Sequence, residues 1–190
     1  MTNLNKAAVG VKETFATAHA HLSTLKSDIV EKLANVQNDD ERAELDKARM
    51  RAETHEKFNA ALTDMSAQAL NYLAKLDISA EALTQQSREL KKRCIKMIEA
   101  IAHSKTIDDR ALESIVMRLA QKNDASLTLA QIQREMQHDT TTQAQYFKSC
   151  ALFFNFASYS KSDKTVTFKY DAKVLKDLIA LYSKEEVVSE

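Results

Sequence analysis

Glycine and proline are almost missing from this chain: among 190 residues there is one glycine, Gly10, and no proline. Sandwiches, barrels and Rossmann sheets depend on tight turns and strand bends, which these two residues normally supply. A chain this poor in both residues is best accommodated by helices joined through short polar connections. We therefore predict a mostly helical protein, long enough for one sizeable domain or two small ones.

Three segments before residue 104 repeat apolar residues in steps of three and four, the spacing of one face of an α-helix. The first covers Lys6 to Gln37, the second begins at a cap formed by Asn38, and the third follows the sequence LDISAE. We expect these helices to pack as an antiparallel bundle or a long coiled-coil hairpin over residues 1–104.

The apolar stripes of these helices contain few aromatic residues, which leaves part of a stripe available for another chain. We expect the segment with Leu22, Leu25 and Ile29 to be shared with a second copy or another protein. The long-helix region is therefore predicted to serve assembly, as a homo-oligomer or with a protein partner.

From Thr106 onward the pattern changes to shorter segments. The sequences TIDD, TLAQ and TTTQ each place a threonine three residues before aspartate or glutamine, as in a helix-capping box, and each precedes an amphipathic run. Strict alternation follows in KTVTFKY, where Val166, Phe168 and Tyr170 lie on one side of a strand. With ASYS before it and the loop KSDK between, this segment predicts a β-hairpin near residues 157–170.

Three short helices, the hairpin and a final helix capped by Asp171 follow one another in this half of the chain. That order is typical of a winged helix-turn-helix module. We therefore predict a winged-helix-like domain over residues 105–190, in which one small hairpin completes a core too small for helices alone.

The polar side of the predicted recognition helix and the hairpin loop carry residue types that contact DNA. Glutamine pairs with adenine through two hydrogen bonds, and threonine and lysine reach bases and phosphates. The loop lysines are expected to contact the phosphate backbone. The candidate DNA-binding residues are Thr141, Thr142, Gln145, Lys148, Lys161 and Lys164. No arginine lies on this face, so a solvated surface used only for protein contact is the alternative.

A second basic feature is the run RELKKRCIK, in which Arg88, Lys92 and Lys96 repeat every four residues along one helical stripe. Like charges at this spacing repel by a few tenths of a kcal/mol per pair, so a partner of opposite charge is expected. A phosphate backbone is one such partner. The acidic residues between Asp39 and Asp46, in this chain or a neighbouring one, are the partner we favour.

Residues for metal binding or catalysis do not form a recognisable constellation. Glu135 and His138 make one Glu-x-x-His pair, whereas a di-iron bundle needs two such pairs and two further glutamates. Cys150 lies on an apolar face, and Cys94 has no histidine near it in sequence, so neither resembles an activated nucleophile. A single glycine excludes a glycine-rich phosphate loop. We predict no metal site, no cofactor and no enzymatic activity.

Charge and cysteine content limit the cellular setting. Lysine plus arginine and aspartate plus glutamate number 27 each, so any attraction to nucleic acid must be local. The two cysteines form no CxxC motif, which disfavours a zinc site or a disulfide framework and suits a reducing compartment. No apolar run reaches the length of a membrane span. We expect a soluble, cytoplasmic protein without membrane contact.

Two functions from different classes fit these features. The first is a non-enzymatic, DNA-associated accessory or regulatory protein with a coiled-coil assembly region and a winged-helix-like module that binds duplex DNA. The second is a helical scaffold or adaptor subunit that binds only protein. A basic polar face around Thr141 favours the first, whereas an exposed apolar patch from Phe153, Phe156 and Tyr159 favours the second.

Overall fold

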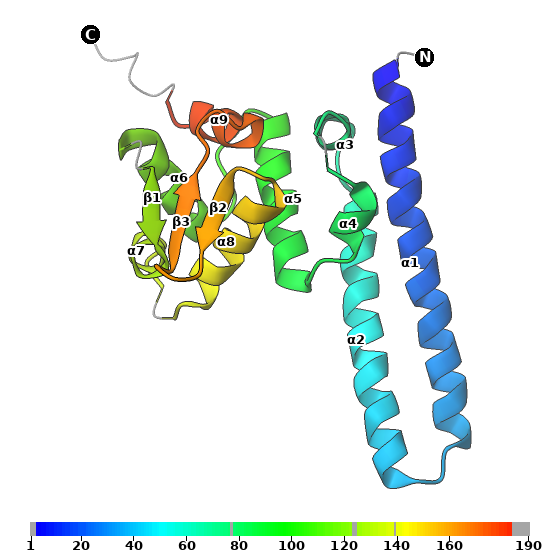
Figure 1. The fold of residues 1–190 in the computed structure, drawn as a ribbon. Helices are drawn as coiled ribbons and strands as arrows, with labels where there is room; N and C mark the ends of the chain where they lie inside the picture. Colours follow the sequence, from blue (N-terminus) through cyan, green and yellow to red (C-terminus); the bar gives the residue numbers. More distant parts are fainter. Residues whose placement is uncertain (1–2, 77, 123–124, 139, 184–190) are drawn as a thin grey trace. The chain divides into compact units, whose positions relative to one another are not determined.

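A computed structural model describes residues 3–183 apart from residues 77, 123–124 and 139. The described chain is mostly helical with one small antiparallel sheet, as the scarcity of glycine and proline predicts (Figure 1). It divides into two compact units, residues 1–91 and residues 92–190. This division falls inside a helix, whereas the change of sequence pattern placed the predicted boundary after residue 104.

Two long helices dominate the N-terminal unit, α1 (Asn3–Asn35) and α2 (Asp39–Thr63). A short connection joins them, and they lie side by side as a helical hairpin (Figure 1). Asn38 caps α2, because its side-chain oxygen accepts from the backbone N–H groups of Asp40 at 2.9 Å and Glu41 at 3.2 Å. The predicted start of the second helix is therefore confirmed.

The N-terminal unit continues with shorter helices than the apolar spacing predicts. After α2 the chain forms α3 (Ala67–Ala74), α4 (Ala80–Thr84) and α5 (Arg88–Ala102), the last of which continues into the second unit. Ser66 and Ser79 each accept a hydrogen bond from the backbone N–H three residues later, so a new helix begins after each serine. The prediction of three long helices before residue 104 was wrong, because apolar spacing continues across these caps.

The core of the N-terminal unit takes side chains from each of its first four helices. α1 packs against α2, α3 and α4. The residues with no more than 1% of their surface exposed include Phe15, Leu62, Leu73 and Leu83. Burying a side chain of this size contributes roughly 2 kcal/mol of apolar transfer free energy.

The C-terminal unit combines helices with a three-stranded sheet. After α5 its elements are α6 (Arg110–Lys122), β1 (Ser126–Thr128), α7 (Leu129–Glu135), α8 (Thr142–Phe153), β2 (Ala157–Ser160), β3 (Thr165–Phe168) and α9 (Lys173–Ala180). The strands are antiparallel in the order β1–β3–β2. The hairpin predicted near residues 157–170 is therefore confirmed as β2 and β3.

The third strand, β1, was not predicted. It has three residues, too few to show an alternating pattern, and the last of them, Thr128, is also the N-cap residue of α7. Leu127 is buried opposite Val166 of β3, and Tyr159 of β2 lies opposite Val166 on the other side. The hairpin is thus the centre and one edge of a sheet, not the only β element of the described residues.

Three phenylalanines join the sheet region to α8. Phe147 is fully buried, and its ring centroid lies 6.3 Å from that of Phe156 and 6.2 Å from that of Phe168. Tilted rings at these separations attract one another in addition to burying apolar area. Val166 is also fully buried while Thr167 is exposed, so the predicted alternation is confirmed.

Thr128 forms the one capping box that the threonine spacing predicted correctly. Its Oγ1 accepts from the N–H of Gln131 at 3.2 Å, and Gln131 Oε1 accepts from the N–H of Thr128 at 2.8 Å. This reciprocal pair satisfies two backbone donors at the start of α7.

The remaining cap predictions were wrong. In TIDD the aspartate, not the threonine, caps α6, because Asp109 Oδ1 accepts from the N–H of Leu112 at 3.2 Å. In TTTQ the spacing marks Thr140, whereas the N-cap residue of α8 is Thr141, which makes no side-chain capping bond. Ala172, rather than Asp171, is the N-cap residue of α9. Spacing identifies candidate caps, whereas the side chain that reaches the free N–H depends on the backbone entering the helix.

Thr128 and Thr141 provide a matched test of the capping box, because both are N-cap residues and only Thr128 makes the side-chain bonds. We expect Thr128→Ala to lower the free energy of unfolding of the C-terminal unit by about 1 kcal/mol, because the backbone N–H of Gln131 loses its acceptor. Thr141→Ala should cost clearly less, since its hydroxyl caps nothing. Urea denaturation followed by tyrosine fluorescence measures both, and equal losses would contradict the assignment.

Candidate functional site

The polar side of α8 faces away from the core of the C-terminal unit. The buried residues of this helix are Ala144, Phe147, Cys150 and Ala151. On the other side Thr141 and Thr142 are exposed, and Gln145, Lys148 and Ser149 are half-exposed. The predicted division of α8 into an apolar and a polar side is therefore confirmed.

Lys148 does not extend freely into solvent. Its Nζ donates to Gln145 Oε1 at 2.6 Å and lies 4.5 Å from the centroid of the Tyr159 ring. Tyr159 belongs to β2, which packs against α8. The structure thus joins two candidate DNA-binding residues to a tyrosine that the sequence assigned to an apolar patch.

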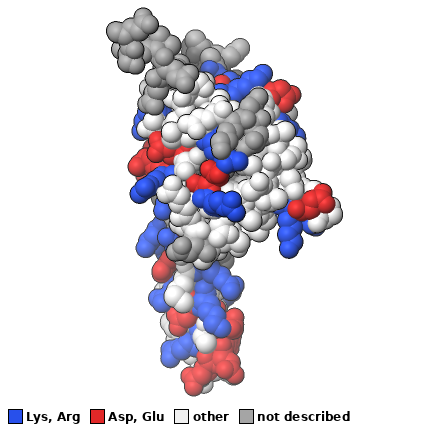
Figure 2. Space-filling view, turned by 90° about the vertical axis from the view of Figure 1, so that its left-hand side faces the viewer, with Lys and Arg blue, Asp and Glu red and all other residues white. Residues whose placement is uncertain are grey.

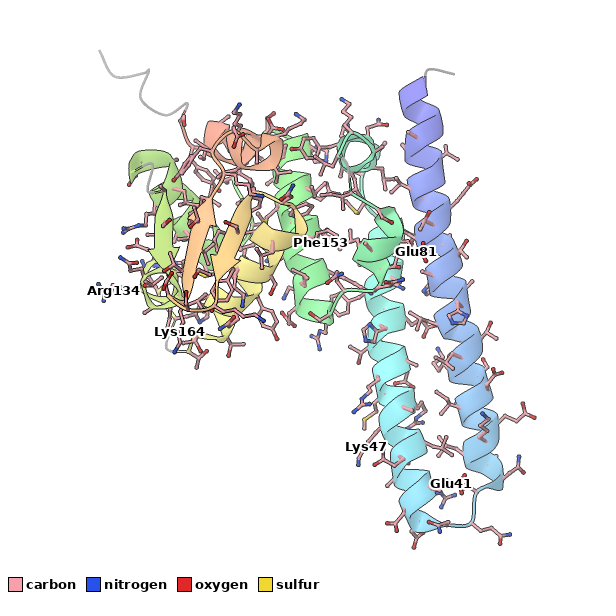
Figure 3. The ribbon with its side chains drawn as sticks, in the orientation of Figure 1. Glu41, Lys47, Glu81, Arg134, Phe153 and Lys164 are labelled. Atoms are coloured by element: carbon pink, nitrogen blue, oxygen red, sulfur yellow. The ribbon has the colours of Figure 1, made fainter. Side chains whose placement is uncertain are left out.

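The loop between β2 and β3 presents Lys161 and Lys164 on the surface. Within the loop Ser160 Oγ donates to the Asp163 carboxylate at 2.9 Å, and Lys164 adopts a positive φ of 52°. The Lys164 carbonyl accepts from the N–H of Leu129 at 3.2 Å, which connects the loop to the start of α7. Figure 3 shows Lys164 at this end of the hairpin. The loop is therefore an ordered turn with two outward lysines.

The aromatic residues near α8 do not form the exposed apolar patch that would favour a protein partner. Phe156 is fully buried, and Phe153 packs edge-on against Phe154 with ring centroids 5.2 Å apart. Lys148 lies over the ring of Tyr159. Leu152 is the exposed apolar residue of this helix, with 39% of its surface accessible.

Lys96, from the basic stripe of α5, pairs with the start of α6. Its Nζ donates to the carbonyl of Asp108 at 2.5 Å and lies 3.3 Å from the Asp109 carboxylate. Burial alone would raise the pKa of Asp109, but the Leu112 N–H and the charges of Lys96 and Arg93 together lower it. This member of the stripe joins two elements of the C-terminal unit.

The other two members of the stripe are closer to solvent. Arg88 lies over the Phe58 ring, 5.1 Å from its centroid, and 3.4 Å from the carboxylate of its neighbour Glu89. Lys92 is exposed. The stripe therefore has no common partner within the described residues.

The acidic residues favoured as the partner of this stripe have ion-pair partners in their own helix, and their pairing with the stripe of a neighbouring chain stays a prediction. Glu44 pairs with Lys47 at 2.7 Å and Asp46 with Arg49 at 3.2 Å, each within α2. Figure 2 shows the opposite charges intermingled along the long-helix part of the molecule. Ion pairs three residues apart on one helix form without a second element, so these carboxylates are already neutralised locally.

A groove of about 750 Å³ opens in the N-terminal unit between α1, α2 and α4. Polar side chains line much of it, among them Thr14, His21, His55, Asn59, Glu81 and Gln85. Glu81 projects from α4 (Figure 3). No spacing rule predicts this groove, because its lining comes from three helices.

Lys91 is fully buried beside this groove, and its Nζ donates to the Oδ1 of buried Asn59 at 2.7 Å. Burial lowers the pKa of Lys91 from 10.5 to about 8, since one amide oxygen replaces only part of the lost hydration. Burial, and then the charge of Lys91, also lowers the pKa of His55. The sequence pattern does not single out this lysine, because its neighbours in RELKKRCIK are also basic.

Cys94 of α5 and Cys150 of α8 meet in the core of the C-terminal unit. Both are fully buried free thiols, with their Sγ atoms 4.0 Å apart. Burial, and then the neighbouring Cys150 thiol, raises the pKa of Cys94. Thiols in such surroundings are poor nucleophiles, which agrees with the sequence interpretation.

The predicted assembly residues of α1 differ in exposure. Ile29 is buried, Leu22 is half-exposed, and Leu25 has 42% of its surface accessible. Val30 of α1 and Met50 of α2 are also exposed, at 49% and 55%. Ile29 therefore belongs to the core of the helical hairpin, whereas Leu25 lies at its surface.

Metal-ligating side chains and helix character bear on two further expectations, for the part of the chain that the structure describes. There, no group of three or more histidine, cysteine, aspartate or glutamate residues is placed to hold a metal ion. Glu135 instead pairs with Arg118. None of the described helices combines the length and apolar character needed to cross a bilayer.

Comparison of the chain with protein-family models, curated proteins and solved structures gave no match.

The buried lysine gives the N-terminal unit a pH dependence. Because the folded-state pKa of Lys91 lies below its unfolded value, the unfolded chain binds more protons between about pH 8 and pH 10.5. Stability must therefore rise with pH across this window. Relative to Lys91→Met, wild type should gain about 2 kcal/mol in free energy of unfolding from pH 8 to pH 10.

Lys92→Met is the matched control, since Lys92 is exposed and adjacent. Its stability difference from wild type should stay constant over the same range in urea denaturation. If the stability difference between Lys91→Met and wild type also stayed constant with pH, folding would leave the pKa of Lys91 unchanged, which would contradict the burial of its ammonium group.

Proposed function

We propose that this protein is a non-enzymatic, DNA-associated accessory or regulatory protein, and that residues 110–168 form a winged helix-turn-helix module. The element order α6–β1–α7–α8–β2–β3 and the strand order β1–β3–β2 support this topology. In this assignment α8 is the recognition helix and the β2–β3 loop is the wing.

The observation that carries the proposal is the position of two polar surfaces at one end of the C-terminal unit. The start of α8 and the β2–β3 loop lie at the same end of the sheet (Figure 1). The first carries Thr141, Thr142 and Gln145, and the second carries Lys161 and Lys164. A helix in the major groove reads base edges while an adjacent basic loop contacts phosphates, which matches this division of residue types.

A protein partner at α8 is less well supported. The patch expected for it lacks Phe156, which is fully buried, and Tyr159 is covered by Lys148. Protein contact is instead assigned to the long-helix hairpin, where Leu25, Val30 and Met50 are exposed. A scaffold or adaptor that binds only protein is the second candidate, favoured by these exposed apolar side chains.

The chemistry of the buried groups supports a non-enzymatic role in a reducing compartment such as the cytoplasm. Lys91 has no accessible surface from which to attack a substrate. Cys94 and Cys150 are unbonded thiols 4.0 Å apart, a state that reducing conditions favour.

Salt dependence tests the proposal. At low salt the full chain should bind duplex DNA, with log affinity falling linearly with log salt concentration. Lys161→Ala and Lys164→Ala should each reduce the slope by about one, because each removes a phosphate contact. Lys176→Ala, at an exposed position of α9 at the opposite end of the sheet, should leave the slope unchanged. Equal effects of all three would indicate non-specific attraction to net charge.

Light scattering at micromolar concentration tests assembly. We expect the chain to self-associate and Leu25→Glu to reduce the average mass, because a charge at an apolar contact must be desolvated. Thr24→Glu, an exposed neighbour on another side of α1, is the control and should keep the wild-type mass. A wild-type chain that is monomeric at this concentration would contradict homo-oligomerisation through the surface around Leu25.

A further inference from the structure

The proposed recognition helix carries a side-chain pair whose polarity is fixed by the fold. Lys148 Nζ donates to Gln145 Oε1 at 2.6 Å, one turn away on α8. An ammonium group offers only hydrogens, so it pairs with the oxygen of the carboxamide and not with its nitrogen. This contact orients the amide and leaves Nε2 at the other end of the group.

Tyr159 holds the ammonium in this position from the neighbouring strand. Lys148 Nζ lies 4.5 Å from the centroid of the ring, within the range at which a cation is attracted to an aromatic face. Lys148 and Tyr159 are both half-buried, so water weakens this attraction less than at an open surface. The pair is therefore ordered by α8 and β2 before any ligand is bound.

We propose that this pair selects guanine in the major groove of duplex DNA. The inference rests on the proposed function and narrows it to one base. Adenine presents an acceptor, N7, and a donor, the N6 amino group, so glutamine reads adenine with both ends of its amide. Here the oxygen of Gln145 already accepts from Lys148, and the positive charge beside it opposes the approach of a second donor.

Guanine presents two acceptors, O6 and N7, on the same edge. Gln145 Nε2 and the remaining hydrogens of Lys148 are all donors, so they complement guanine and not adenine. Residue type alone predicted that Gln145 pairs with adenine. Because Gln145 Oε1 accepts from Lys148, the group left to contact a base is Nε2, which can only donate. The structure therefore favours guanine over the adenine expected from residue type.

Selection of the full-length chain on a randomised duplex library at low salt tests this inference. Wild type should enrich guanine at one position and prefer it about tenfold over adenine in competition between two duplexes that differ only there. Lys148→Met frees the Gln145 oxygen, so the guanine preference should fall to within about twofold or reverse toward adenine. Gln145→Ala should also lose the preference, and it provides the answer if Lys148→Met does not fold.

Lys161→Met is the matched control, because it removes a lysine from the wing and not from the recognition helix. It should weaken binding to both duplexes alike and keep the guanine preference. An adenine preference in wild type, binding without base preference, or a guanine preference that survives both α8 substitutions would overturn the inference while DNA binding stands. Absence of affinity for any duplex at low salt would overturn the inference and the proposed function together.

Discussion

The buried ring of Phe147 determines which surface the C-terminal unit presents. It packs between Phe156, just before β2, and Phe168, at the end of β3, and it has no accessible surface. Because an α-helix has 3.6 residues per turn, fixing this side of α8 against the sheet directs Thr142 and Gln145 outward. The polar face of α8 is thus a consequence of aromatic packing, and the same packing brings β2 close enough for Tyr159 to contact Lys148.

A different constraint governs the N-terminal unit. Its helices bury large apolar residues such as Phe15 and Leu62, yet they also enclose the ammonium group of Lys91. The Nζ of Lys91 donates a hydrogen bond to the Oδ1 of Asn59 at 2.7 Å. A buried cation with one neutral partner is destabilising relative to an apolar side chain of similar size, so this unit carries a stability cost at neutral pH that its apolar packing must offset.

The helical class, the Asn38 cap, the Thr128 capping box and the β2–β3 hairpin could all be predicted from sequence, because each depends on residues close together in the chain. What could not be predicted depends on contacts between distant segments. β1 is too short to show a sequence pattern, and it is recognised as a strand by its pairing with β3. The thiols of Cys94 and Cys150 lie 4.0 Å apart because α5 contacts α8. The helix breaks at Ser66 and Ser79 lie within continuous apolar spacing, so the caps there are not distinguished from the pattern of a single helix. Of the candidate site, residue types located the polar face, but only the structure could show that Lys148 occupies the oxygen of Gln145.

The most direct test of the central claim is an amide chemical-shift titration of the full-length chain with a mixed-sequence duplex at low salt. If α8 and the wing bind DNA, the amides of Thr142, Gln145, Ser149 and residues 161–164 should shift together and saturate with a single affinity. Shifts confined to α1 and α2, or no shifts at a duplex concentration well above that of the protein, would contradict the account.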